Sequence, residues 1–381
     1  MKRSTVPALA AIVLCLMTLV GCQDRATAMR IGVIACLTGP IAPYGQSLKE
    51  GAVLAAAEVN ASAKTPRDSV VLVIDDAKST PNDALLAFKK QVDIDRLQVV
   101  MGIVGSSLAM AVAPEAERRH VVFLSTGAST PDFTKAGDYC FRNRSSAKQE
   151  VERLAEVAYG SLAAKRVAIL YVTNDYGVSY KKVFAARFAE LGGTVVLEEG
   201  VDQGATDMRA QLEKARALGP DAIYVVGQAL EAGHAVRQAR ELGVKAQLLG
   251  TIGMESADFL KIAGNSANGV IYSAANYNPN SSDSAVASFE RNFEAKYGKP
   301  ADLFAANAYD AVKILVRIMR ANGRSSDQIK AGLYAVKDYP GASGLTSFDA
   351  NGDVTKPIAV KSIKDGKFVV LDSVPAGGLQ R

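Results

Sequence analysis

Two clusters of small and hydroxylic residues stand out as groups that could bind an anion. Gly105-Ser106-Ser107 follows one apolar, β-branched run, and Ser125-Thr126-Gly127-Ala128-Ser129-Thr130 follows the next. Free backbone N–H groups and hydroxyls at such places can hold a carboxylate without a counter-charge. The same residues could instead serve only as helix caps, and the residue types alone favour neither role.

The N-terminus indicates export and lipid attachment. Lys2 and Arg3 precede an uncharged, mostly apolar run, Val6–Val20, which is about fifteen residues long and so too short to span a bilayer. Leu19-Val20-Gly21-Cys22 then resembles a bacterial lipoprotein box. An ordinary secretory signal with a chance cysteine is the alternative. We expect residues 1–21 to be a signal peptide, Cys22 to carry the lipid, and 22–29 to form a tether.

A lipid-anchored chain of this kind lies in the periplasm or at the cell surface, held to the membrane by its N-terminal lipid. That compartment permits a disulfide between Cys36 and Cys140, although both lie in apolar runs and could simply be buried thiols.

The charge pattern argues against a nucleic-acid partner. The chain has 44 basic and 39 acidic residues, a formal net charge of +5, and no Lys/Arg tract. Interleaved charges do not form the concentrated phosphate-binding face that nucleic acids require.

No constellation typical of an enzyme accompanies the hydroxyl clusters. The sequence contains no phosphate loop, no Gly-x-Ser-x-Gly turn and no His-Glu-x-x-His helix, and His120 and His234 lack partners at metal-ligand spacing. Asp75-Asp76 is similar to the acidic pair of receiver domains, but that function needs a cytosolic kinase. Asp349–Asp353 is similar to the start of a calcium loop, but Val354 stands where glycine is required. We therefore expect no catalytic residue, no metal and no cofactor.

The clusters must be positioned by alternating strands and helices, and the alternation occurs twice. In the first part of the chain we expect strands at 30–35, 70–74, 99–103 and 121–125, with helices at 46–60, at 81–93 and after Ser106. After Phe141 the pattern restarts, with strands at 166–172, 194–198 and 222–226 and helices through Ala189, at 208–217 and at 232–242. This pattern predicts an α/β protein with two doubly wound parallel-sheet lobes. Ligands bind such sheets beyond the carboxyl ends of the strands, where both clusters lie.

The order and spacing of the motifs resemble the type I periplasmic solute-binding proteins of branched-chain amino-acid ABC importers, the leucine/isoleucine/valine-binding proteins. The resemblance extends over nearly all of the chain after the signal. The matching motifs are Ile31–Gly45, Asp75-Asp76, Gly102–Ser107, Ser125–Pro131, Asn174–Gly177, Val236–Arg240, Leu249-Gly250, Phe304–Ala311 and Phe348–Asp353.

The resemblance implies two lobes joined by a three-stranded hinge. Lobe 1 would contain residues 30–143 and 275–343, and lobe 2 would contain residues 144–274 and 344–381. The crossovers would lie near 141–145, 272–276 and 341–344, and strands at 358–363 and 368–371 would return to lobe 2.

The resemblance also implies a ligand-binding site. The Ser106 hydroxyl, the Gly127 backbone, and the backbone and hydroxyl of Ser129 would hold a ligand carboxylate, with Gly105 beside them and Ala128 lining the cavity. Three aromatic side chains would wall the rest of the pocket, although each could instead belong to the core: Tyr44, Tyr176 and Phe304. Gln228 stands where the leucine-binding proteins carry an aromatic residue.

One position departs from the family pattern. The amino-acid binders place an acidic residue just after the Leu-Gly strand end, where it meets the ligand ammonium, and Ile252 occupies that place here. An ammonium closed into a cleft without its partner costs several kcal/mol. Either Asp175, Glu231 or Glu255 replaces the missing acid, or the ligand has no ammonium.

These features predict a solute-binding subunit of an ABC importer, not an enzyme, that captures a small carboxylate, amide or amino-acid-like molecule by closure of the lobes about the hinge. Its partners would be the small-molecule ligand and permease subunits in the inner membrane. One alternative is a sensory or regulatory receptor on the same fold. Another is a true branched-chain amino-acid binder with a relocated acidic residue.

Overall fold

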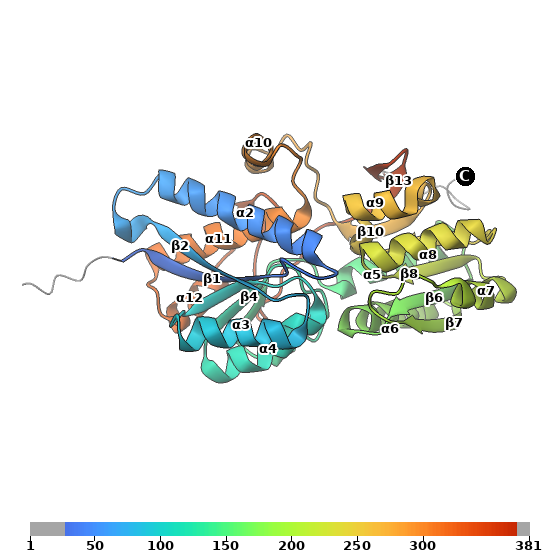
Figure 1. The fold of residues 1–381 in the computed structure, drawn as a ribbon, viewed down its shortest axis with the longest axis horizontal. Helices are drawn as coiled ribbons and strands as arrows, with labels where there is room; N and C mark the ends of the chain where they lie inside the picture. The colour runs from blue at the N-terminus through green and yellow to red at the C-terminus, as the bar shows by residue number, and fades with distance from the viewer. Residues whose placement is uncertain (1–26, 372–381) are drawn as a thin grey trace, which may run out of the picture.

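The computed structural model describes residues 27–371 as two α/β bodies that lie side by side (Figure 1). The predicted signal peptide, Cys22 and most of the tether lie outside the described residues, as do residues 372–381. No helix in the described range 27–371 is long and apolar enough to cross a membrane.

The first body is built on a five-stranded parallel sheet with the order β2-β1-β3-β4-β5. Its strands are β1 (Met29–Ala35), β2 (Val70–Asp76), β3 (Val99–Gly102), β4 (Val122–Ser125) and β5 (Cys140–Arg142). One face is covered by α2 (Ala42–Ala61) and α11 (Leu303–Ala321), and the other by α3 (Pro81–Asp93) and α4 (Ser106–Arg119) (Figure 1). This body also contains α10 (Ser284–Tyr297), α12 (Ser326–Tyr334) and the hairpin of β11 (Tyr339–Gly341) and β12 (Gly344–Thr346).

The second body is built on a seven-stranded sheet with the order β14-β13-β10-β9-β8-β6-β7. Its parallel strands are β6 (Arg166–Val172), β7 (Thr194–Val201), β8 (Ala222–Val226), β9 (Gln247–Gly250) and β10 (Ile271–Ala275). Two antiparallel strands extend it, β13 (Ile358–Lys364) and β14 (Lys367–Val370). Its helices are α5 (Ala147–Tyr159), α6 (Asp175–Glu190), α7 (Arg209–Leu218), α8 (Ala229–Glu241) and α9 (Ala257–Ala263).

The two sheets share one topology, which confirms the predicted α/β class with two doubly wound lobes. In chain order, the parallel strands of both sheets run second, first, third, fourth, fifth across the sheet. Such a sheet has a crevice where the strand order reverses, between its first and third strands. The crevices therefore lie beyond β1 and β3 in the first lobe and beyond β6 and β8 in the second.

The chain passes between the lobes three times. It passes from β5 to α5 through residues 143–146, from β10 to α10 through residues 276–283, and from β12 to β13 through residues 347–357. Within the last segment, Phe348 and Val354 pair in an isolated antiparallel β-bridge. In this segment Asp349–Asp353 forms a turn, and the described residues hold no cluster of potential metal ligands.

Several predicted boundaries need correction. Helix α2 begins at Ala42 rather than near Gln46, because Pro43 lies in its first turn, where proline loses no hydrogen bond. Helix α8 begins at Ala229 rather than at Ala232, with Gln228 as its N-cap. Cys36 and Cys140 are both buried free thiols, so no disulfide joins them.

Candidate ligand-binding site

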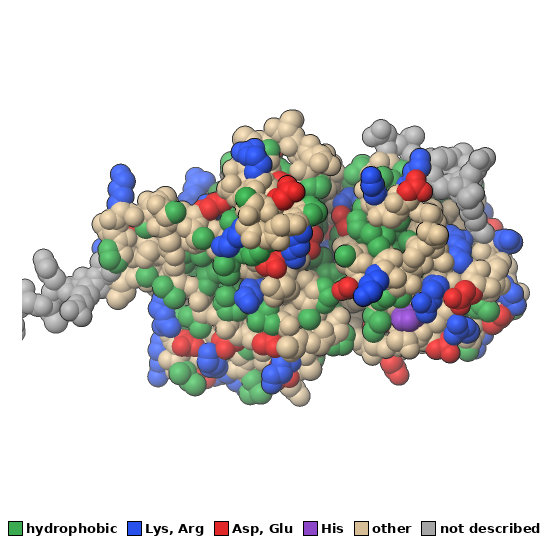
Figure 2. Space-filling view, turned by 45° about the horizontal axis from the view of Figure 1, so that its top comes forward, with side chains coloured by type: hydrophobic (Ala, Val, Ile, Leu, Met, Phe, Trp, Pro, Cys, Tyr) green, Lys and Arg blue, Asp and Glu red, His purple; other side chains and the backbone are tan. Residues whose placement is uncertain are grey.

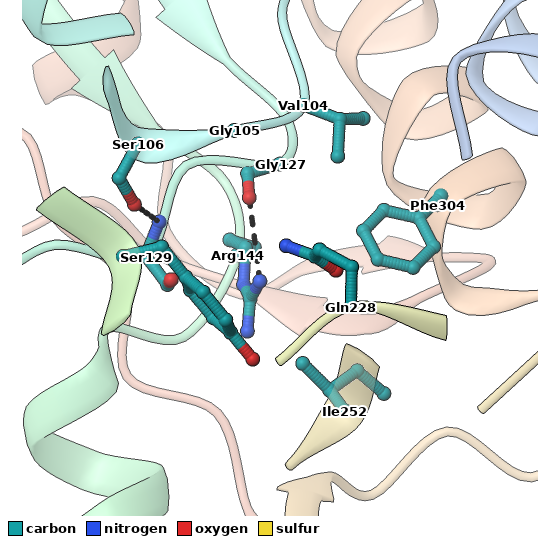
Figure 3. A pocket seen from close by; sticks show the side chains of 10 residues that line it. Val104, Gly105, Ser106, Gly127, Ser129, Arg144, Gln228, Ile252 and Phe304 are labelled. Carbon is teal, nitrogen blue, oxygen red and sulfur yellow. Dashed lines mark hydrogen bonds between the residues drawn. The ribbon is translucent and has the colours of Figure 1, made fainter. Parts of the chain in front are cut away.

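A small cavity lies between the carboxyl edges of the two sheets (Figure 3). The enclosed space is about 10 Å³, room for roughly one water molecule. Its lining residues are Val104, Gly105, Ser106, Gly127, Ser129, Arg144, Tyr176, Gln228, Ile252 and Phe304. All of these except Val104 and Arg144 were singled out from the sequence.

The first lobe contributes the hydroxyls of Ser106 and Ser129 to the lining, and the Ser106 oxygen is held by two hydrogen bonds. Ser106 begins α4 after Gly105, whose φ of 106° is a conformation that glycine adopts readily. The Ser106 Oγ accepts hydrogen bonds from the backbone N–H groups of Ser129 at 3.4 Å and Thr130 at 3.2 Å. Because both contacts use oxygen lone pairs, the Ser106 hydroxyl hydrogen remains available to an acceptor in the cavity. The N-cap of α4 is Gly105, so neither Ser106 nor Ser129 caps that helix.

The second lobe contributes the opposite wall from the ends of three strands. Tyr176 lies in the first turn of α6, after β6, and its hydroxyl donates to Thr251 Oγ1 at 2.6 Å. Burial raises the pKa of the Tyr176 hydroxyl, which therefore stays neutral. Gln228 follows β8, and Ile252 follows β9 at the start of a short 3₁₀ turn. Ile252 is buried and places an aliphatic side chain against the cavity.

Arg144 brings a buried positive charge to the cavity that the sequence analysis missed. It lies in the segment between β5 and α5, and its side chain is 3 % exposed. Its Nη2 forms a salt bridge with Glu150 at 2.6 Å, its Nη1 donates to the Gly127 carbonyl at 3.3 Å, and its Nε donates to the Ser145 carbonyl. Burial disfavours the charged arginine, but the Glu150 carboxylate outweighs that effect and holds the Arg144 pKa above its ordinary value.

The three acids that could replace the missing family carboxylate do not line the cavity. Asp175 is exposed. Glu231 is buried, and its two oxygens accept the backbone N–H groups of Gly204 and Gln228. Glu255 is paired with Lys361 at 2.9 Å. The fixed charge that reaches the cavity wall is therefore the guanidinium of Arg144.

Two predicted site residues lie just behind the lining. Tyr44 packs against Phe304 with ring centroids 5.0 Å apart, and it also lines a larger cavity of about 870 Å³ that includes Ser256 and Asp302. Ala128 is buried, and its N–H donates to Ser125 Oγ.

Hydrogen bonds across the cleft hold the lobes together. The Tyr44 hydroxyl donates to the Gly253 carbonyl at 2.7 Å and accepts from the Ala229 N–H at 3.0 Å. The Asp175 N–H donates to Ser107 Oγ at 3.1 Å. The structure is thus a closed form in which the crevices of both lobes face one shared site.

The comparison with known proteins agrees with this geometry. The sequence pattern described as periplasmic binding protein matches residues 28–367. The chain belongs to the periplasmic binding protein family. Proteins of this family bind ligands without transforming them, so this binding protein is not an enzyme.

Individual relatives cover nearly the whole binding protein. The Leu/Ile/Val-binding protein BraC3 of Rhizobium johnstonii is 30 % identical over 346 residues, 90 % of this chain and 93 % of the relative. The crystal structure of a leucine-binding protein from Thermotoga maritima matches with a TM-score of 0.86 and 29 % identity, covering 90 % of this chain and 98 % of that one. A benzoate complex of a solute-binding protein from R. palustris has a TM-score of 0.82 at 20 % identity, covering 90 % and 95 %, which shows a shared fold.

Replacement of Ser106 or Ser129 by alanine should weaken ligand binding. Losing a hydrogen bond to a charged group costs about 1.5–3 kcal/mol, so each variant should bind roughly ten- to a hundred-fold more weakly, measured by calorimetry. Melting without ligand should be almost unchanged for Ser129→Ala, whereas Ser106→Ala should melt somewhat lower because the Ser129 and Thr130 N–H groups lose their acceptor. Ser362→Ala is the matched control, because the buried Ser362 hydroxyl donates to the Val270 carbonyl within the second lobe. Unchanged affinity in both test variants would contradict their assignment to the site.

Replacement of Tyr44 by phenylalanine should favour separation of the lobes. The variant keeps the ring against Phe304 but removes both hydrogen bonds of the hydroxyl across the cleft. Ligand affinity should fall about two- to tenfold, and small-angle X-ray scattering should show a more extended unliganded protein. In Tyr297→Phe the lost hydroxyl contact, to the Glu50 carbonyl, lies within the first lobe, so affinity and scattering should stay at the parent values.

Proposed function

We propose that this protein is the lipid-anchored, extracytoplasmic solute-binding subunit of an ABC importer. Its ligand would be a small carboxylate or amide without a free ammonium. The first lobe captures the ligand at its serine hydroxyls, and the second lobe closes over it by rotation about the three connecting segments. The closed form then docks on permease subunits in the inner membrane.

The observation that carries the ligand assignment is the charge of the cavity wall. Hydroxyls, an amide and a guanidinium line the cavity, while carboxylate side chains are missing from the lining. Ile252 offers neither charge nor acceptor at the place where amino-acid binders carry an acid. An ammonium buried there would lose its hydration without gaining a partner, which costs several kcal/mol.

The fold itself accommodates both kinds of ligand. A binding protein from Streptococcus pneumoniae with 28 % identity is known in complex with isoleucine, and the R. palustris protein of the same fold holds benzoate. The side chains of the cavity must therefore decide between the two kinds of ligand. The charge of the lining is for this reason stronger evidence for the ligand class than the ligands of related proteins.

Calorimetry with matched ligands tests the proposal. Leucine and valine are compared with 4-methylpentanoate, 3-methylbutanoate and benzoate, which have no ammonium. Organic acids should bind more tightly than the amino acids, because only the amino acids bury an unpaired ammonium. Sub-micromolar binding of leucine or valine, with no organic acid binding more tightly, would overturn the proposed ligand class.

Lipid attachment is tested separately at Cys22. The Cys22→Ser variant lacks the thiol that takes the diacylglyceryl group, so cells should release the protein or leave it unprocessed. Labelled fatty acid should enter the parent chain and not the variant. Incorporation of label into the serine variant would show that the anchor lies elsewhere.

A further inference from the structure

We propose that Arg144, held by Glu150, selects the ligand by the group that stands beside its carboxylate. The favoured ligand is a small acid with a second acceptor oxygen, such as a 2-oxo acid, and an ammonium in the same position is rejected. This inference rests on the proposed function, since it specifies which acid the proposed site takes.

The position of Arg144 places its charge in the ligand site rather than on the surface. It is one of the ten residues that line the cavity, and it is almost completely buried. Figure 3 shows its guanidinium among the serines of the first lobe and the side chains of the second. Whatever enters the cavity must therefore contact this cation or displace it.

The described residues accept only some of the N–H groups of the Arg144 guanidinium. A guanidinium carries five N–H groups. Among the described residues, Arg144 donates to the carbonyl of Ser145, the carbonyl of Gly127 and the carboxylate of Glu150. Two N–H groups on the terminal nitrogens remain, and an acceptor oxygen of a bound ligand would satisfy them.

Glu150 fixes the arginine but offers nothing to a ligand cation. Its Oε1 accepts from Arg144 and from the Ser145 hydroxyl, and its Oε2 accepts from the Tyr180 hydroxyl at 2.6 Å. It is fully buried behind Arg144 and does not line the cavity. The pair therefore presents only its positive partner to the ligand.

Arg144 also occupies an acceptor that an ammonium would use. The Gly127 carbonyl faces the cavity and accepts from Arg144 Nη1 at 3.3 Å (Figure 3). An ammonium near this carbonyl would meet a fixed like charge in a site that excludes water, where repulsion is poorly screened. Arg144 thus opposes amino acids as well as favouring acids.

Gln228 supports the same choice from the second lobe. Figure 3 shows its amide nitrogen on the side of the cavity where Arg144 lies. Donors of Gln228 and Arg144 that face one space would both be satisfied by an acceptor placed between them. A carbonyl oxygen or a second carboxylate on the ligand provides that acceptor, and a bare methylene does not.

Two sets of matched ligands test the effect of the group beside the ligand carboxylate. The first set is 4-methyl-2-oxopentanoate, 4-methylpentanoate and leucine, which differ only in the group beside the carboxylate: an oxygen, hydrogens or an ammonium. The second is phenylglyoxylate, phenylacetate and phenylglycine. The wild-type protein should bind the oxo acid of at least one set roughly tenfold or more tighter than the plain acid, and the amino acid most weakly.

Two variants separate selection by Arg144 from a structural role. Arg144→Met with Glu150→Gln removes both charges, so neither is left buried alone. It should bring the affinities of the oxo acid and the plain acid to within about threefold and improve amino-acid binding relative to the plain acid. Glu150→Gln alone keeps the guanidinium and an amide oxygen that can accept from it, but removes its counter-charge, so it should lower the melting temperature and bind the oxo acid up to about tenfold more tightly. A structural role would weaken binding in both variants.

A salt bridge of the second lobe provides the control. Lys181→Met with Glu198→Gln removes a pair at 2.7 Å outside the cavity lining. It should leave the ratios between ligands unaltered, whatever its effect on the melting temperature. If the Arg144 and Glu150 variants keep the wild-type affinity ratios between ligands and still prefer organic acids to amino acids, the role proposed for Arg144 is wrong and the proposed ligand class stands. Tightest binding of leucine or phenylglycine to the wild-type protein, or no binding of any of the six, would overturn the proposed ligand class as well.

Discussion

A buried charge must have a partner, and this constraint organises the region where the two lobes join. Arg142, at the end of β5, pairs with Asp353 in the third connecting segment, and Arg144 pairs with Glu150 of α5. Lys356 donates to Ser343, whose hydroxyl in turn donates to Asp310 of α11. Burial lowers the Lys356 pKa to about 8, although Asp310 opposes that shift. The Arg142–Asp353 and Ser343–Asp310 contacts join segments far apart in the sequence, so the connecting segments are located by charge pairing as well as by packing.

The same region positions the site. Both sheets have the same strand order, and their carboxyl edges face each other across the cavity. In the first lobe, the loops after β3 and β4 supply hydroxyls and backbone groups, and in the second, the loops after β6, β8 and β9 supply Tyr176, Gln228 and Ile252. Arg144 comes from neither set of loops but from the connection between the lobes. The chemistry of the pocket is therefore tied to the hinge as well as to the two sheets.

What the sequence could predict follows from how local each signal is. Strand β6 and helix α3 have the predicted bounds, because continuous apolar runs and helical periodicity are local patterns. The serine clusters after β3 and β4 were singled out because ligands bind beyond the strand ends of a doubly wound sheet, whereas Tyr176, Gln228 and Ile252 were singled out through the family resemblance. Arg144 was missed because its burial depends on Glu150 and Tyr180, which reach it only through the packing of α5 and α6. Two arginines separated by one residue, next to an apolar strand and followed by an acid in the first turn of a helix, are the signal that could have indicated it.

The closed state is held by few contacts across the cleft, and this matters for the response to ligand. The Tyr44 hydroxyl makes two of the hydrogen bonds between the lobes, and the Asp175 N–H makes another. A hydrogen bond contributes only about 0.5–1.5 kcal/mol net, so these contacts bias closure without fixing it. A ligand that bridges the first-lobe serines and the second-lobe wall binds the closed form better than the open one, and that difference in affinity sets how far it can shift the equilibrium. Arg144 donates to Gly127 of the first lobe and to Glu150 of the second, so in this closed form one side chain contacts both lobes. Ligand selection and closure thus act through the same side chain.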